Sequence, residues 1–255
     1  MGEYYKMRKI YIPILNIIMA EMMMFLGEIS YGIGLHTINL LIIILLVIFD
    51  KSEIRIKHVL QSLILVILLR MVSISMPQFF TTVLLQYSLI YGIMFIPIYS
   101  TINSQQISAK DLGISFRKIY IYIPLAILIG IVIGMVEYKI LNPVSLIDRI
   151  NFSSIVFIGI VMFIFIGTVE ELIFRGILQT RLEKVFGLKF GILMSGIIFG
   201  IVHVGYGIIN EIIFAMVFGI IMGYIFHKSR NIPFMILIHG TTNMTLYGIL
   251  PMVIL

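Results

Sequence analysis

The sequence predicts an all-α fold, a polytopic membrane helix bundle with eight or nine transmembrane helices. Of its 255 residues, 60% are hydrophobic and only 12% are charged, whereas average globular domains carry roughly 25% charged residues. The apolar residues form runs close to the ~17–25 residues needed to cross a bilayer, and basic residues collect in alternate connections between the runs. Because so little polar surface is available, the composition excludes a soluble enzyme, a nucleic-acid-binding protein and a disordered protein.

The apolar runs are spread along the whole chain. They lie near residues 9–27, 34–49, 57–76, 78–99, 118–138, 151–174, 189–205, 208–227 and 232–254. The second run is short, and only Gly205, Tyr206 and Gly207 separate the seventh from the eighth, so the expected count is eight or nine. No small-residue cleavage site follows the first run, which is therefore not expected to be a signal peptide.

Basic residues mark one side of the predicted bundle. With nine spans, all but Arg70, Lys139 and Arg149 fall at the N-terminus and in alternate connections. These residues are Lys6, Arg8, Lys9, Lys51, Arg55, Lys57, Lys110, Arg117, Lys118, Arg175, Arg181, Lys184, Lys189, Lys228 and Arg230. The asymmetry predicts a cytoplasmic N-terminus and a plasma-membrane protein. It also accounts for the net charge of +6 without a nucleic-acid partner. The chain contains no cysteine, which excludes disulfides, thiolate zinc sites and a cysteine nucleophile.

Ionisable side chains inside apolar runs indicate where function lies, because such residues are costly in hydrocarbon. Glu170 and Glu171 occur late in the sixth run, His203 lies near the end of the seventh, and His239 and Asn243 lie in the last run. Residues four apart share a helix face. We therefore expect Glu171 to pair with Arg175, whereas Glu170 points elsewhere and stays free for chemistry.

The same spacing places His239 with Asn243, and Phe199 with His203, on common faces. A free carboxylate, two imidazoles and an amide on three helices supply a base, a proton-sharing group and donors for an oxyanion. Structural interpretations stay open for each motif alone: an interfacial ion pair, a histidine bonded to a carbonyl, and polar contacts between helices.

The three motifs together resemble the signature of the CPBP family, the CAAX-processing and bacteriocin-processing intramembrane endopeptidases also called Abi proteins. They are Glu170-Glu171-x-x-x-Arg175, Phe199-x-x-x-His203 and His239-x-x-x-Asn243. The resemblance covers roughly residues 100–255, and Asp111-Leu112-Gly113-Ile114 is similar to the family's cytoplasmic lead-in. It implies N-terminal transmembrane helices over residues 1–100 and a CPBP-like catalytic transmembrane core over 101–255, together one integral unit.

The resemblance also implies residue roles. Glu170 would activate a water that His203 helps to position, and His239 and Asn243 would stabilise the oxyanion. Glu171, Arg175 and Phe199 would support the site's geometry. Substrates would be hydrophobic or prenylated peptides that reach the site from the membrane lipid.

Two mechanisms are compatible with the site residues. Glu170, His203 and His239 could hold zinc with an open position, as in a metalloprotease, although the sequence lacks the zincin pattern His-Glu-x-x-His. We prefer a mechanism that requires no cofactor, because no obvious carboxylate lies near either histidine in the sequence to serve as the usual second partner of a ligating imidazole.

Alternatives from other functional classes are a non-catalytic bacteriocin-immunity or scaffolding membrane protein and, less favoured, a small-solute transporter. A scaffold would not need all four polar residues, and the paired helix breaks typical of transporters are not evident.

Several further expectations concern placement. Glu21 and Arg70 are expected to pair, Glu137 and Glu211 to lie near the membrane interfaces, and His36 to be a solvated residue at a helix end. The predicted boundaries place His203 deeper than Glu170 and His239. With nine spans, the three can meet only if residues 176–190 partly re-enter the membrane or the seventh helix starts late; an eight-span count would also change the depths.

Overall fold

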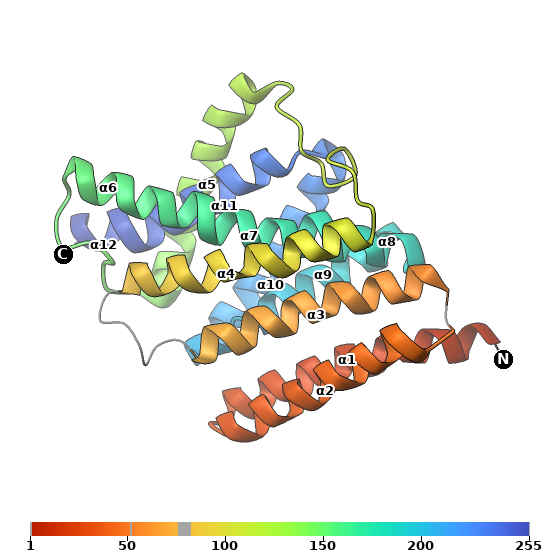
Figure 1. Cartoon of the computed structure of the whole chain (residues 1–255). Coiled ribbons are helices and arrows are strands. Elements are labelled where there is room, and N and C mark those ends of the chain that lie inside the picture. Colours follow the sequence, from red (N-terminus) through yellow and green to blue (C-terminus); the bar gives the residue numbers. More distant parts are fainter. Residues whose placement is uncertain (1, 52, 76–82, 255) are drawn as a thin grey trace.

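The structure is a computed structural model that describes residues 2–51, 53–75 and 83–254. Within these ranges every regular element is a helix, which confirms the predicted all-α bundle (Figure 1). Seven helical segments of the described chain are long and apolar enough to cross a membrane. The protein is therefore an integral membrane protein with a polytopic helical architecture.

The N-terminal part contributes four long helices. They are α1 (Gly2–Phe25), α2 (Ile29–Phe49), α3 (Ile54–Ser75) and α4 (Val83–Ser104). Helix α1 packs against α2 and α3, and α3 packs against α4. The predicted run at 78–99 begins in residues 78–82, which lie outside the described residues; its remainder forms most of α4.

The C-terminal part contains one continuous helical segment of 35 residues, Phe152–Phe186. It follows α5 (Ile119–Leu141) and alternates between α-helical and wider π-helical turns. Its parts are α6 (Phe152–Gly159), η1 (Ile160–Gly167), α7 (Thr168–Glu171), η2 (Leu172–Gln179) and α8 (Thr180–Phe186). Stretches of π-helix are rare and often occur at functional sites, and here they flank the short α7 that carries both glutamates.

The remaining elements complete the bundle. They are α9 (Leu188–Ile201), the 3₁₀ turn η3 (Val204–Tyr206), α10 (Ile209–Ser229), α11 (Ile232–Met244), η4 (Thr245–Ile249) and α12 (Leu250–Val253). Helix α9 packs on α10, and α11 packs on α5 and on η1. Together with η1–α8, these helices surround the polar residues of the motifs.

The sequence analysis ended the sixth helix too early. Arg175 and Arg181 were assigned to a basic loop, but both are buried within the long helix, which continues to Phe186. The chain reverses at Gly187, whose φ of +85° is accessible to glycine. Glu170 lies 17 residues before Gly187 and His203 lies 16 residues after it. The two side chains therefore reach similar depths, and no re-entrant segment is needed.

Two predicted spans are helical but lie outside this set of seven. The first run forms α1, and the last forms α11, η4 and α12 in succession. Neither is among the seven segments selected by length and composition. Whether one or both cross the bilayer, as the expected eight or nine spans require, stays a prediction.

Glycines allow α9 and α10 to approach closely. Gly196 and Gly200 on α9, and Gly219 and Gly223 on α10, have the small-xxx-small spacing that brings membrane helices together. A Cβ added to Gly196 would lie 2.7 Å from the backbone nitrogen of Ile220. The backbone contact leaves no room for a side chain, and it fixes the helix that ends next to His203.

Candidate active site

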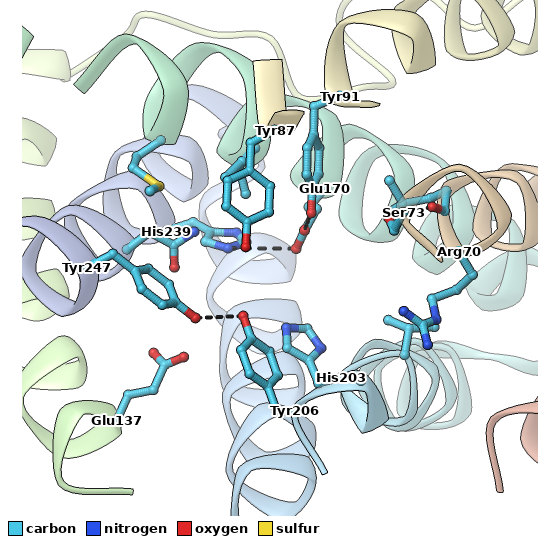
Figure 2. Close-up of a pocket in the computed structure, with 16 residues that line it drawn as sticks. Arg70, Ser73, Tyr87, Tyr91, Glu137, Glu170, His203, Tyr206, His239 and Tyr247 are labelled. Carbon is cyan, nitrogen blue, oxygen red and sulfur yellow. Dashed lines mark hydrogen bonds and ion pairs between the residues drawn. The ribbon is translucent and has the colours of Figure 1, made fainter. Parts of the chain in front are cut away.

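A cavity of about 300 Å³ opens among α3, α4, the long helix, α9–η3, α5 and α11–η4. It brings together all four residues predicted to be catalytic: Glu170, His203, His239 and Asn243. Figure 2 shows the glutamate and both histidines facing this cavity from different helices. Residues that are up to 73 positions apart in the sequence thus line one space.

Glu170 is 7% exposed, and its two carboxylate oxygens have different neighbours. Oε1 accepts a hydrogen bond of 2.5 Å from the hydroxyl of Tyr91 on α4. Oε2 lies 3.7 Å from Nε2 of His239 (Figure 2). The sequence analysis predicted that Arg175 would pair with Glu171 and not with Glu170. The structure agrees, because the ion pair of Arg175 is with Glu171.

Glu171 is fully buried and joins two of the motifs. Its Oε1 accepts a hydrogen bond of 2.8 Å from Nη1 of Arg175, the pair predicted from the spacing of four residues. The same oxygen accepts a hydrogen bond of 2.7 Å from Nδ1 of His239. The expectation that no carboxylate lies near the histidines was therefore wrong for His239, because sequence distance concealed a contact between residues 68 positions apart.

The ring of Phe199 packs against the buried guanidinium of Arg175. The guanidinium carbon of Arg175 lies 4.4 Å from the centroid of the Phe199 ring, a cation–π arrangement. The ring also packs beside His203, with centroids 4.8 Å apart, and beside His239 at 6.0 Å. Phe199 thus contacts all three motifs.

His203 follows the end of α9, where Nδ1 donates a hydrogen bond of 2.7 Å to the carbonyl oxygen of Phe199. This bond fixes the ring and leaves Nε2 for other partners. The residue also lines the cavity, so the structural and functional interpretations of His203 are not exclusive. Asn243 lies one turn after His239 on α11 and lines the same cavity.

The proposed zinc ligands do not form a recognisable metal centre. Across the described ranges, no group of three or more His, Cys, Asp or Glu side chains is arranged to hold a metal ion. Glu170 and His239 contact the tyrosine and the glutamate described above, and His203 bonds a backbone carbonyl.

Several cavity residues were missed by the sequence analysis. Tyr206 and Tyr247 share a hydrogen bond of 2.6 Å between their hydroxyl groups (Figure 2), and Tyr87 lies beside Tyr91 on α4. The sequence analysis assigned no role to the tyrosines, but tyrosine carries a hydroxyl that requires a partner when buried. That requirement is the signal that could have identified them.

Glu137 and Glu211, the two acids expected near the membrane interfaces, are both buried among the helices. Glu137 is 9% exposed and lines the cavity, and Glu211 is fully buried beside it on α10. Both oxygens of Glu211 are buried without a hydrogen-bond partner among the described residues, although Glu137 lies close by.

The predicted pair of Glu21 with Arg70 is confirmed. Arg70 donates from Nε and Nη2 to the two oxygens of Glu21, at 2.6 and 2.8 Å. His36 was expected to be solvated, but it is fully buried and its Nε2 lies 3.0 Å from Glu21. Arg70 also lines the cavity, so its charge is already balanced where it faces the site.

Of three comparisons with known proteins, the one with family models gives a match. Residues 152–245 match the family model described as type II CAAX prenyl endopeptidase Rce1-like. The matched segment contains every residue of the three motifs, from Glu170 to Asn243. Comparisons with curated proteins and with solved structures found no match. The family recognised from the motifs is thus supported: over residues 152–245 the chain is similar to the Rce1-like family model, consistent with the CPBP family.

Proposed function

We propose that the protein is a CAAX-type intramembrane endopeptidase that hydrolyses a peptide bond of a lipid-anchored or hydrophobic peptide substrate. The observation that carries the proposal is the meeting of Glu170, His203, His239 and Asn243 in one cavity formed by membrane helices. The Rce1-like match over the same residues supports this class of reaction.

In the proposed reaction Glu170 is the general base. Tyr91 occupies Oε1 of Glu170, so Oε2 is the oxygen that accepts a proton from water. His203 donates from Nδ1 to a backbone carbonyl, and its neutral ring therefore presents the lone pair of Nε2. A water that donates one hydrogen to Glu170 and the other to His203 has its oxygen directed at the scissile carbonyl.

Attack by this water forms the new C–O bond and moves the carbonyl π electrons onto oxygen. Glu170 takes the proton that the water loses. The tetrahedral intermediate then collapses, the C–N bond breaks, and Glu170 returns the proton to the leaving amine nitrogen. General acid–base catalysis of this kind typically contributes ~10²–10⁴-fold to the rate.

His239 and Asn243 are proposed to stabilise the oxyanion. Because Glu171 accepts from Nδ1 of His239, Nε2 can also donate only when the imidazole is doubly protonated. Glu171 orients the His239 ring through this hydrogen bond, and Asn243 supplies amide hydrogens from the next turn. Donors placed where charge develops are often the largest catalytic contribution.

The experiment that tests the function is a comparison of processed membrane peptides in cells that express the wild type or Glu170→Ala. Peptides cleaved only with the wild type would support the proposal and identify the substrate class. Glu28→Gln, at an exposed site between α1 and α2, is the matched control. Identical peptide profiles for wild type and Glu170→Ala would contradict the proposal.

A further inference from the structure

A second polar region lies at the end of the bundle where α8 meets α9, which is also the end that holds the N-terminus (Figure 1). Two cavities of about 500 and 540 Å³ adjoin there and share Asp111, Arg181 and Lys184 as lining residues. They have no lining residue in common with the catalytic cavity. We call these two spaces the basic cavities.

Arg181 is the central side chain of the basic cavities. It is only 7% exposed, and its Nε donates a hydrogen bond of 2.6 Å to Oε1 of Gln105. Gln105 is itself held by a hydrogen bond of 3.1 Å from Nε2 to the carbonyl oxygen of His58 on α3. The guanidinium is thus held in place by a neutral partner.

The terminal amino groups of Arg181 have no such anchor. Over residues 2–51, 53–75 and 83–254, no other hydrogen bond and no ion pair with a carboxylate is found for its guanidinium. Asp111 acts on this guanidinium only at longer range, and a buried charge without a carboxylate in direct contact is costly. Since Arg181 lines both basic cavities, an anion in them would supply a counter-charge in direct contact.

The charges that line the basic cavities leave a positive excess. Basic residues are Arg55, Lys110, Arg181, Lys184 and Arg230, against the acids Asp111 and Glu183. Glu183 is already paired with Arg230 at 2.8 Å. Asp111 accepts a hydrogen bond from the hydroxyl of Ser108, which together with nearby Lys184 and Arg181 lowers the pKa of its carboxyl group. Even with Asp111 ionised, the cations outnumber the acids.

The rim of the basic cavities is apolar where it meets the membrane-crossing helices. Ile54, at the start of α3, is 63% exposed, and Leu188, at the start of α9, is 41% exposed. Each lines one of the two cavities. A ligand that fits this arrangement has an anionic head and an apolar body.

We propose that the basic cavities bind the phosphate group of an anionic membrane lipid, contacted by the guanidinium of Arg181 and the ammonium of Lys184. Basic pockets between transmembrane helices near the membrane surface bind phosphorylated headgroups in this way, and arginine matches the geometry of phosphate oxygens. The lipid's acyl chains lie along the apolar rim. This proposal does not depend on proteolytic activity.

Native mass spectrometry of the full chain in detergent tests the proposal, with phosphatidylglycerol, phosphatidylcholine and inorganic phosphate as separate probes. The wild type should retain one phosphatidylglycerol in preference to phosphatidylcholine. Lys184 is exposed, so Lys184→Gln should fold normally and bind this lipid about fivefold more weakly, the effect of one surface cation. Arg181→Gln should reduce binding further. Lys189→Gln, at an exposed site outside the basic cavities, is the control and should bind as the wild type does.

Three results would overturn the proposal. Equal retention of phosphatidylcholine would show that the headgroup charge is not recognised. Equal weakening by Lys184→Gln and Lys189→Gln would show diffuse surface attraction instead of a site. Inorganic phosphate that binds as tightly as phosphatidylglycerol would show a free-anion site with no lipid contribution. Glu170→Ala should bind the lipid as the wild type does, so a failure of the proposed proteolysis would leave this test intact.

Discussion

Tyr91 is the residue that links the N-terminal helices to the proposed base. Its hydroxyl donates to Oε1 of Glu170 and thereby fixes the carboxylate. Hydrogen bonds to charged groups contribute about 1.5–3 kcal/mol, so Tyr91→Phe should reduce kcat by about tenfold or more with little change in the fold. Steady-state cleavage rates measured beside Tyr122→Phe, whose ring stacks on Phe234 outside the cavity, check this. Wild-type kcat in Tyr91→Phe would remove Tyr91 from the account.

Glu171 differs from Glu170 because one of its oxygens accepts hydrogen bonds from both Arg175 and His239. Glu171→Gln leaves the buried cation of Arg175 without its ionic partner, and breaking a buried pair costs about 3–5 kcal/mol. We expect a clear loss of unfolding free energy, together with lower activity because His239 loses its orienting carboxylate. Unfolding in detergent and cleavage rate are measured on the same sample, with Glu28→Gln as control. An unchanged melting temperature would show that the pair does not support the fold.

Sequence patterns succeeded at the residue scale where partners lie on one helix. The spacing of four residues predicted the pair of Glu171 with Arg175, and the three motifs identified four residues of one cavity. Contacts between distant segments were not predictable. Tyr91 and Glu170 are 79 residues apart, and nothing in either local pattern records that α4 lies beside α7.

At the scale of elements, the contact between α9 and α10 determines where His203 lies. A side chain at Gly196 would meet the backbone of Ile220 and Gly219, which cannot move aside as a flexible side chain can. Overpacking typically costs about 1–3 kcal/mol, so Gly196→Val should destabilise the protein and displace His203. Thermal unfolding and activity are compared with Gly159→Ala, where an added Cβ meets no heavy atom within 4 Å. Equal stability of the two variants would contradict the close packing.

The long helix shows why element boundaries were misjudged. Arg175 and Arg181 suggested a loop, since buried arginine is rare in membranes. The structure buries both because Glu171 and Gln105 supply partners. These partners depend on tertiary contacts, which hydropathy along the chain does not reveal.

At the scale of the whole molecule, hydropathy predicted the architecture well. All seven apolar helical segments correspond to predicted runs. The two runs outside that set, α1 and the run beginning with α11, contain the buried polar residues Glu21 and His239.

We predict that the isolated protein needs no metal cofactor for cleavage. Nδ1 of His239 bonds Glu171, Nδ1 of His203 bonds a backbone carbonyl, and no group of three or more His, Cys, Asp or Glu side chains in the described residues is arranged to hold a metal ion. Because the described residues offer no such ligand group, we expect extensive chelation to leave the cleavage rate unchanged. Elemental analysis of the active protein before and after chelation is the check. Stoichiometric zinc that tracks activity across preparations would overturn the metal-free mechanism, since bonded histidines also serve as zinc ligands.

The most direct test of the central claim is the cleavage rate of purified, monodisperse Glu170→Ala beside the wild type on a peptide substrate in lipid or detergent. Glu170 is proposed to be the base that activates water, and loss of a positioned base typically costs ~10²–10⁴-fold in rate. The account predicts a loss of that size in a protein whose unfolding temperature is unchanged. A folded Glu170→Ala that cleaves at the wild-type rate would contradict it.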